Sequence, residues 1–280
     1  MTSAMEFVLR PWSIAVYTWR EGIRKKTLVG FLILSLLVIF GSSFLGTFLD
    51  ATYTGDADVD MDLKLVKDIC VTTISIFGIL ITIFISASVV PNEVENKVIY
   101  TVLSKPVSRL QYLFGKFMGV QLIVIINLLL MGGLFFIALY LRQNVLPTLL
   151  LWSILLTYFE FLIVSSFTFA ISCTSTSPVL PTISGLFVYL TGNLTEYLND
   201  VSQRSQQSGE IIDNIIGYIA QGLYITLPNL QNFSLKTQIL NSQPNDPPTD
   251  VLITQLMIYG VVNAAVGFAL AFWIFRRKEL

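Results

Sequence analysis

Five long stretches of the sequence carry almost no charge, and this constrains the fold more than any other feature. Four of them lack Asp, Glu, Lys and Arg altogether: 27–49, 69–92, 117–141 and 251–275. The fifth, 143–195, contains only Glu160 and is long enough for two helices, with a polar turn at 173–178. A helix needs about 20 apolar residues to cross a bilayer. Since the runs do not alternate with period two, we expect an all-α polytopic membrane protein. The six predicted transmembrane helices are 28–49, 69–91, 117–141, 148–172, 179–197 and 251–275.

The composition excludes several other classes of protein. Of the 280 residues, 54% are hydrophobic and 12% are charged, whereas soluble domains have about 25% charged residues. The net charge of −1 gives no basic surplus for nucleic acid, so we expect no nucleic-acid partner. Histidine, the commonest metal ligand, is absent, and the two cysteines fall near opposite faces of the membrane. We therefore predict no metal site, no cofactor and no disulfide in this chain.

The distribution of basic residues predicts the orientation. Twelve of the 17 Lys and Arg residues lie in three segments, namely the N-terminal arm, the loop after the second span and the C-terminal tail. Cytoplasmic segments of membrane proteins are enriched in Lys and Arg. The sequence therefore places both termini in the cytoplasm, which six spans satisfy and seven would not. For this reason we interpret the amphipathic segment 211–227 as an extracytoplasmic helix within an outer segment, 198–250, that does not cross the membrane.

Two further segments lie outside the predicted spans. Residues 1–27 are expected to form an interfacial helix along the inner membrane surface, with an apolar stripe. The stripe consists of Trp12, Val16, Trp19 and Ile23. The segment 50–68 carries four aspartates at alternate positions but lacks the glycine and glutamate of a calcium loop. We expect it to be a solvated acidic loop.

The cytoplasmic segment 92–116, which we call the elbow, is the most informative part of the sequence. Asn92 and Glu95 have the spacing of a helix-starting cap, and Lys105-Pro106 should stop that helix. Ser108 and Gln111 form a second capping box that should start a helix running into the third span. Further along, Gly115 and Gly119 are spaced for close helix packing. Taken from the residues alone, the elbow fits either a solvated loop or a rigid docking element for a soluble partner.

The elbow also resembles a family signature. Leu103-Ser-Lys-Pro-Val-Ser-Arg109 followed by Tyr112-Leu-Phe-Gly-Lys116 is similar to the pattern of ABC-2-type permeases, the membrane subunits of ATP-driven exporters. The best-matched branch includes permeases linked to multicopper-enzyme maturation and to gliding. Weaker matches are Trp19–Lys26 before the first span and Leu227–Lys236 before the last. The resemblance covers the chain in order and implies a coupling helix between the second and third spans.

The resemblance also implies partners and site residues. It predicts a permease dimer, as homodimer or heterodimer, in a prokaryotic cytoplasmic membrane, with each copy resting on a separate ABC ATPase subunit that carries the ATP and Mg. The chain itself has no phosphate-binding loop, because Gly115-Lys116-Phe117 lacks the upstream glycine and the following Ser or Thr. We therefore expect no enzymatic activity in this subunit. The residues expected to couple to the ATPase are Glu93, Glu95, Tyr100, Leu103, Lys105, Pro106 and Arg109.

Glu160, near the middle of the fourth predicted span, is the only Asp, Glu, Lys or Arg in the interior of a predicted span. Burying an acidic group at that depth costs about 2.5–3.5 kcal/mol on insertion scales. Two states are open: the side chain is protonated, or it is hydrogen-bonded to a neighbour such as Gln121, Asn127 or Asn263. A role in the transport path and a role in fixing helix packing are weighted equally.

Three functions are consistent with the sequence. The first is the permease of an ABC exporter. The second is a non-transporting scaffold that uses ATP hydrolysis to exert force on an envelope complex, with an extracytoplasmic partner at 198–250. A secondary transporter comes third, because the spans have few charges and no visible inverted repeat. The transported substrate is left open.

Overall fold

The computed structural model describes most of the chain and shows an all-helical bundle. The described residues are 2–52, 56–97, 108–143, 148–195, 197, 217–219, 221–222, 228–234 and 250–277. No strand occurs among them, so the predicted all-α class is confirmed for this part of the chain. The helices are α1 (Thr2–Ile23), α2 (Lys26–Thr52), α3 (Asp56–Glu95), α5 (Arg109–Gln143), α6 (Thr148–Ser172), α7 (Val179–Asn193), the short 3-10 helix η1 (Gln231–Phe233) and α11 (Asp250–Arg277).

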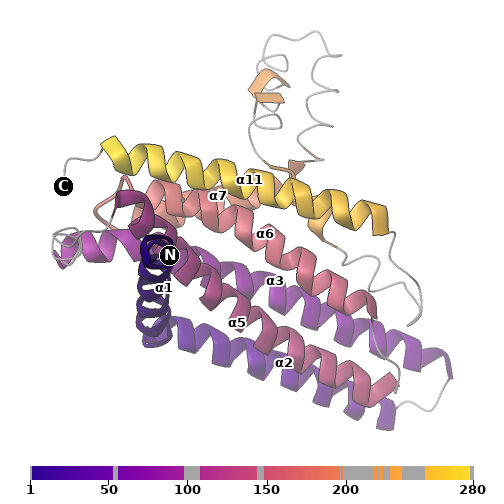
Figure 1. Ribbon diagram of the computed structural model, residues 1–280. Coiled ribbons are helices and arrows are strands. Elements are labelled where there is room, and N and C mark those ends of the chain that lie inside the picture. Colours follow the sequence, from indigo (N-terminus) through magenta and orange to yellow (C-terminus); the bar gives the residue numbers. More distant parts are fainter. Residues whose placement is uncertain are drawn as a thin grey trace.

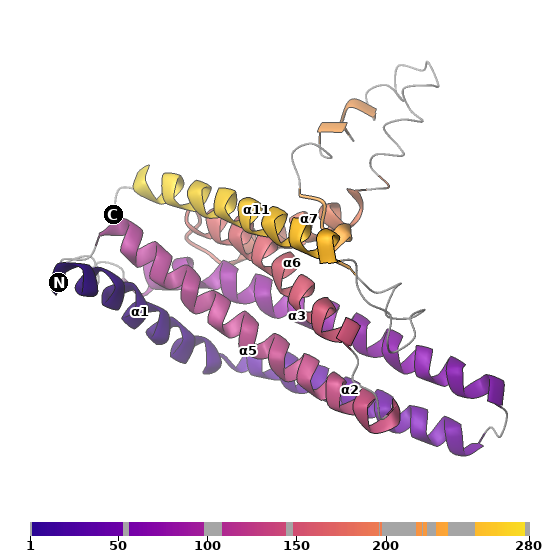
Figure 2. The ribbon, with the colours of Figure 1, turned by 45° about the vertical axis from the view of Figure 1, so that its right-hand side comes forward.

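The long helices lie side by side in an elongated bundle (Figures 1 and 2). At its centre is α6, which contacts α3, α5, α7 and α11, while α2 packs on α3 and α1 packs on α5. Apart from α1, successive helices run in opposite directions, so the end of α3 and the starts of α5 and α7 fall at the same end of the bundle. Because the elbow is attached there, we call this the elbow end.

Four described helices are long and apolar enough to cross a membrane. They cover Lys64–Glu95, Arg109–Tyr140, Leu150–Ser172 and Ile253–Arg277. The apolar part of α2, Lys26–Ser42, is shorter than these four helices. The helix α7 has 15 residues, which corresponds to a length of about 22 Å. Both coincide with predicted spans, but a six-span topology and its orientation stay a prediction.

The structure corrects two expectations about α3. The helix begins at Asp56, so most of the segment expected to be an acidic loop is helical. It also continues through Pro91 and Asn92 to Glu95, so no helix starts at Asn92. Pro91 has no backbone N–H, so α3 loses one hydrogen bond there. The helix nevertheless continues, and the Asn92 carbonyl accepts hydrogen bonds from the backbone N–H and the side-chain amide of Asn96. Lys97, at φ 57°, then takes the left-handed conformation that ends helices.

Many buried hydroxyl side chains of the bundle are satisfied within their own helix. Buried hydroxyls donate to carbonyls one turn earlier in the same helix, as Thr82 does to Gly78 at 2.8 Å and Ser86 to Thr82 at 2.7 Å. Such bonds remove the cost of an unpaired hydroxyl in an apolar medium. The two cysteines, Cys70 and Cys173, are buried, and no disulfide joins them.

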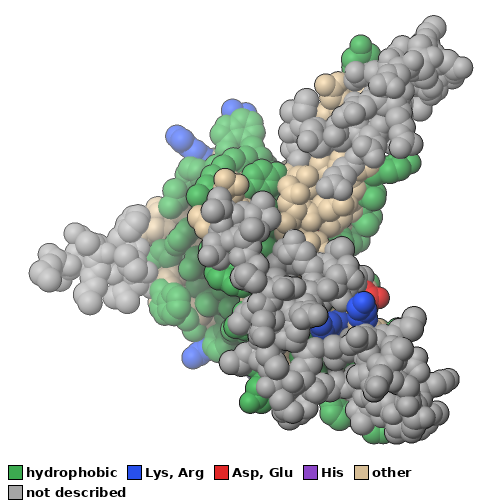
Figure 3. All heavy atoms as spheres, turned by 90° about the vertical axis from the view of Figure 1, so that its right-hand side faces the viewer, with side chains coloured by type: hydrophobic (Ala, Val, Ile, Leu, Met, Phe, Trp, Pro, Cys, Tyr) green, Lys and Arg blue, Asp and Glu red, His purple; other side chains and the backbone are tan. Residues whose placement is uncertain are grey.

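The outer surface of the bundle is strongly apolar. Large hydrophobic side chains point outward along whole helices, and Phe40 on α2 is 65% exposed. Viewed from one side, most of the described side chains are hydrophobic (Figure 3). A soluble monomer rarely exposes such a surface, whereas a membrane protein requires it.

Candidate functional site: the base of the elbow

The second helix of the elbow starts as the sequence predicts. The backbone N–H of Gln111 donates to the Ser108 hydroxyl at 3.2 Å, and the Ser108 N–H donates to the Gln111 side-chain oxygen at 3.0 Å. This reciprocal pair is a capping box, and α5 begins at the next residue, Arg109. The capping box fixes where the second helix of the elbow begins, and this helix continues into the third predicted span.

A buried polar cluster joins the two helices that flank the elbow. Glu93, near the end of α3, is 4% exposed, and its carboxylate accepts hydrogen bonds from the Tyr112 hydroxyl and the Lys116 ammonium of α5. Lys116 is 2% exposed, and its ammonium also lies 5.4 Å from the ring centre of Tyr17 on α1. We call Glu93, Tyr112 and Lys116 the elbow clamp, because they hold α3 and α5 together.

The start of α5 is also tied to the end of α11. The Arg109 guanidinium donates to the backbone carbonyl of Arg276 at 3.0 Å. One turn further on, the Tyr112 ring stacks on Phe275 with 5.8 Å between ring centres. A displacement of the elbow would therefore reach α3 and α11 directly.

The glycine pair of α5 makes a close contact with α1. A Cβ on Gly115 would lie 2.7 Å from the Pro11 carbonyl oxygen, and one on Gly119 would lie 2.8 Å from the Ala15 carbonyl oxygen. The predicted close helix packing is thus confirmed, and its partner is α1. Small residues, glycine above all, let two helix backbones approach this closely.

The face of α1 that packs on α5 is made of small residues. Between Pro11 and Ile23, where burial is described, the buried positions are Pro11, Ala15, Thr18 and Gly22. In the predicted apolar stripe, by contrast, Trp12 and Ile23 are 52% and 47% exposed, and Val16 and Trp19 are partly buried. The stripe is therefore not the main packing face, and its exposed members remain available for a membrane surface, as an interfacial helix needs.

The predicted coupling residues divide into three groups. Glu95 is exposed and Arg109 is partly exposed, so both are accessible at the elbow end. Glu93 differs from the prediction because its side chain is buried in the elbow clamp and cannot face a soluble partner. The remaining four residues lie outside the described part of the chain: Tyr100, Leu103, Lys105 and Pro106.

The partners of Glu93, namely Tyr112 and Lys116, are not among the site residues predicted from the sequence. Tyr112 and Lys116 are four residues apart and so share one face of α5. A tyrosine and a lysine on the same face as two glycines in a helix-packing position were a usable sign that this face is buried. What the sequence could not indicate was that Glu93 would lie opposite them.

Glu160 occupies the middle of α6 and is 5% exposed. Its carboxylate accepts a hydrogen bond of 3.2 Å from the side-chain amide of Asn193, at the end of α7. The three partners expected from the sequence are engaged elsewhere: Gln121 donates to Ser165, Asn127 to the Ile123 carbonyl and Asn263 to the Tyr259 carbonyl. The expectation of a hydrogen-bonded Glu160 is met, but by a neighbour that was not named.

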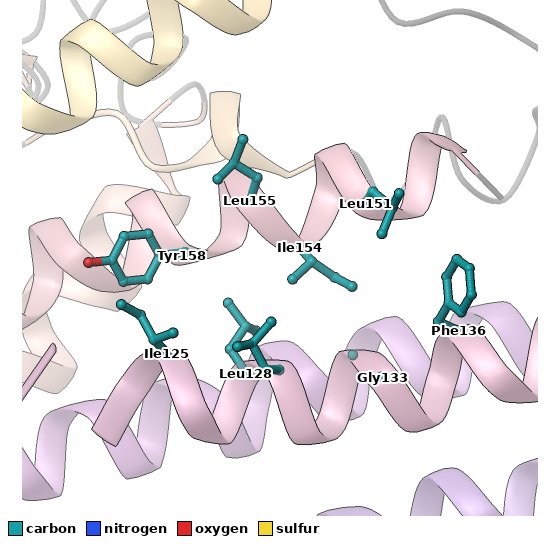
Figure 4. A pocket seen from close by; sticks show the side chains of 10 residues that line it. Ile125, Leu128, Gly133, Phe136, Leu151, Ile154, Leu155 and Tyr158 are labelled. Carbon is teal, nitrogen blue, oxygen red and sulfur yellow. The ribbon is translucent and has the colours of Figure 1, made fainter. Parts of the chain in front are cut away.

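A groove of about 500 Å³ lies between α5 and α6 (Figure 4). Ile125, Leu128 and Phe136 on one side face Ile154 and Tyr158 on the other. Apart from the Tyr158 hydroxyl, the side chains of this groove carry no polar group. It therefore offers almost nothing to orient a polar molecule.

The comparison with protein families decides the identity. The profile of the family described as ABC-2 family transporter protein matches residues 12–280. The chain belongs to the ABC-2 transporter family. As a member of this family, it is the membrane permease component of an ABC transporter. Permeases of this family in general work with an ABC ATPase as partner. The comparison with curated proteins gave no match.

The family match covers the candidate site of this permease. The match extends from the middle of α1 to the C-terminus, so it includes the elbow, the elbow clamp and Glu160. The described residues contain no group of three or more His, Cys, Asp or Glu side chains that could hold a metal ion.

Proposed function

We propose that this ABC-2 permease is the membrane subunit of an ATP-driven exporter in a prokaryotic cytoplasmic membrane. In this proposal two permease copies pair, each copy rests on a separate ATPase subunit, and the elbow receives the movement of the ATPase. The main support for this proposal is that Glu93 of α3 is paired with Lys116 and Tyr112 of α5 in the elbow clamp. A segment whose two flanking helices are joined by a buried ion pair transmits a push instead of absorbing it.

The connections of the elbow support a mechanism. ATP binding would close the two ATPase subunits and draw the elbows toward each other. Because the elbow clamp joins α3 to α5 and Arg109 joins α5 to α11, these helices would move together. The spans of the dimer would then repack to open outward, as a population shift between two packed states.

The charge distribution supports a cytoplasmic position for the elbow end. Several basic residues of the described chain lie there, among them Lys25, Lys97, Arg109 and Arg276. By the positive-inside rule, this clustering favours a cytoplasmic position for the elbow and both termini.

Glu160 is proposed to lie on the transport path. It lies in the helix that contacts four others, and its partner Asn193 ends α7. Acidic residues inside membrane helices commonly serve ion or substrate pathways. The branch linked to multicopper-enzyme maturation and gliding stays a prediction.

The coupling proposal is tested by co-purifying the permease with the ABC ATPase encoded beside it. Glu95→Lys reverses an exposed charge at the start of the elbow, so we expect it to reduce the ATPase recovered with the permease at least tenfold. Lys26→Glu, an exposed charge reversal at the start of α2, is the control and should recover as much ATPase as the wild type. Recovery of ATPase with Glu95→Lys at the level of this control would overturn coupling at the exposed start of the elbow.

The scaffold alternative makes a different prediction. A scaffold would also bind the ATPase, but it would move no substrate and would hold an envelope partner through 198–250. Purified complex in proteoliposomes separates the two, since only the exporter carries a solute across the bilayer when ATP is added.

A further inference from the structure

A crevice of about 370 Å³ at the elbow end opens between α2, α3 and α7. Its lining combines two kinds of side chain. Lys25, Ser88 and Asn92 supply a charged and polar end, whereas Phe84 and Ile183 are hydrophobic. Lys25 directly precedes α2, Asn92 lies near the end of α3, and Ser88 lies one turn before Asn92. Phe84 and Ile183 lie farther from the elbow end along α3 and α7. The crevice is thus amphipathic along the direction of the helices.

The polar end presents a half-buried ammonium. The Nζ of Lys25 donates a hydrogen bond of 2.8 Å to the Ser88 hydroxyl, which is a neutral acceptor. Burial lowers the pKa of Lys25, Glu21 and Glu93 act in the opposite direction, and Lys116 lowers the pKa further. Glu93 is itself paired with Lys116. The desolvated Lys25 ammonium would therefore be stabilised by an added anion.

The start of α7 adds to this field. Pro178, the N-cap residue of α7, lines the same crevice and makes no side-chain cap hydrogen bond. The amino end of a helix carries a partial positive charge, which favours an anion nearby. The effect is secondary to the charge of Lys25, but it has the same sign.

The hydrophobic end faces outward from the bundle. Ile183 is 63% exposed and Phe84 is 38% exposed, and both lie on helices with strongly apolar surfaces. In a membrane this part of the crevice would be in contact with acyl chains. The groove between α5 and α6 is similarly apolar but has no charged end, so it lacks this division.

We propose that the crevice binds an anionic amphiphile of the membrane, with a phosphate headgroup at Lys25 and an acyl chain along Phe84 and Ile183. A phospholipid of the leaflet at the elbow end has both parts in the required order. A soluble phosphate would use the polar end alone. The proposal requires a membrane around the bundle but does not depend on coupling to the ATPase.

Native mass spectrometry of the detergent-solubilised permease tests the proposal. Phosphatidylglycerol is titrated against phosphatidylcholine with the same acyl chains, and the fraction of protein with one bound lipid is measured. We expect Lys25→Gln to weaken phosphatidylglycerol binding about tenfold and to leave phosphatidylcholine binding nearly unchanged. Lys25→Arg should retain binding, and Lys26→Gln, which removes a neighbouring exposed charge, should bind as the wild type does.

A second variant keeps the test independent of Lys25. Ile183→Trp fills the apolar end from an exposed position and should weaken phosphatidylglycerol binding, whereas Leu190→Trp, on an exposed position of α7 outside the crevice, should not. Equal binding by Lys25→Gln and Lys26→Gln would overturn the proposal. Competition by inorganic phosphate at the concentration of the lipid would also overturn it, because the ligand would then be a soluble anion.

Discussion

The carboxylate of Glu93 on α3 is paired with the ammonium of Lys116 on α5, and both side chains are almost completely buried. The Tyr112 hydroxyl donates to the same carboxylate. Burying two charges is costly, and the pairing recovers that cost only when both partners are present. The elbow of this permease is thus attached to a joint that favours a single geometry.

Removal of one partner of this joint should be strongly destabilising. Glu93→Ala leaves the Lys116 ammonium buried without its anion, and we expect a loss of about 3–5 kcal/mol in the free energy of unfolding. The measurement is denaturant unfolding in mixed micelles. The double variant Glu93→Leu/Lys116→Met, which removes both charges, should recover most of that loss. If the double variant were as unstable as Glu93→Ala, the charge pair would not be the cause.

The contact between α1 and α5 should not tolerate even one methyl group. In Gly115→Ala the new Cβ would meet the Pro11 carbonyl oxygen at 2.7 Å, and a backbone atom cannot move aside cheaply. We expect a loss of about 1–3 kcal/mol in the free energy of unfolding. The control is Gly133→Ala on the same helix, where no atom lies within 4 Å of the added Cβ. Equal effects of the two substitutions would contradict the packing described above.

Glu160→Gln separates a structural role from a functional one. The Gln side chain keeps an oxygen that can accept the hydrogen bond from Asn193, so the free energy of unfolding should change by less than about 1 kcal/mol. Transport should nevertheless fall if the carboxylate lies on the path. The measurement is complementation of a strain that lacks the native permease, with Asn263→Ala as control because its amide donates within its own helix. Wild-type complementation by Glu160→Gln would exclude the transport role.

The burial of Lys25 predicts a pH-dependent contribution to stability. The pKa of Lys25 in the folded protein is below the ordinary value of 10.5. At a pH between this lowered pKa and 10.5, the Lys25 side chain is therefore protonated in the unfolded chain more often than in the folded protein. The free energy of unfolding therefore rises with pH through that window. Below the lowered pKa the cost of burying the ammonium is fully present, and above 10.5 it is gone.

Two variants isolate this contribution from other titrating groups. Lys25→Met should rise less steeply with pH than the wild type, and Lys26→Met, which removes an exposed ammonium, should follow the wild-type slope. Thermal unfolding midpoints at a series of pH values below 10.5 provide the comparison. Parallel curves for the wild type and Lys25→Met would show that Lys25 is not desolvated.

Local rules of sequence were sufficient for several features of the elbow. The capping box at Ser108 and Gln111 and the tight packing at Gly115 and Gly119 depend only on residues within one or two helical turns, and the structure contains both. A local rule failed at Asn92. Asn92 and Glu95 have the spacing of a helix-starting cap, but α3 continues through Asn92 to Glu95. The helix loses only the one hydrogen bond that Pro91 cannot donate.

The sequence by itself determined that this protein is a bundle of apolar helices, because uncharged runs of about 20 residues leave few alternatives. It also determined which face of α5 packs closely. Only the tertiary structure decided which helix meets that face, that Glu93 is buried against Lys116, and that Asn193 is the partner of Glu160. The physical reason is that helical periodicity specifies a face within one segment, whereas its partner depends on how distant segments pack.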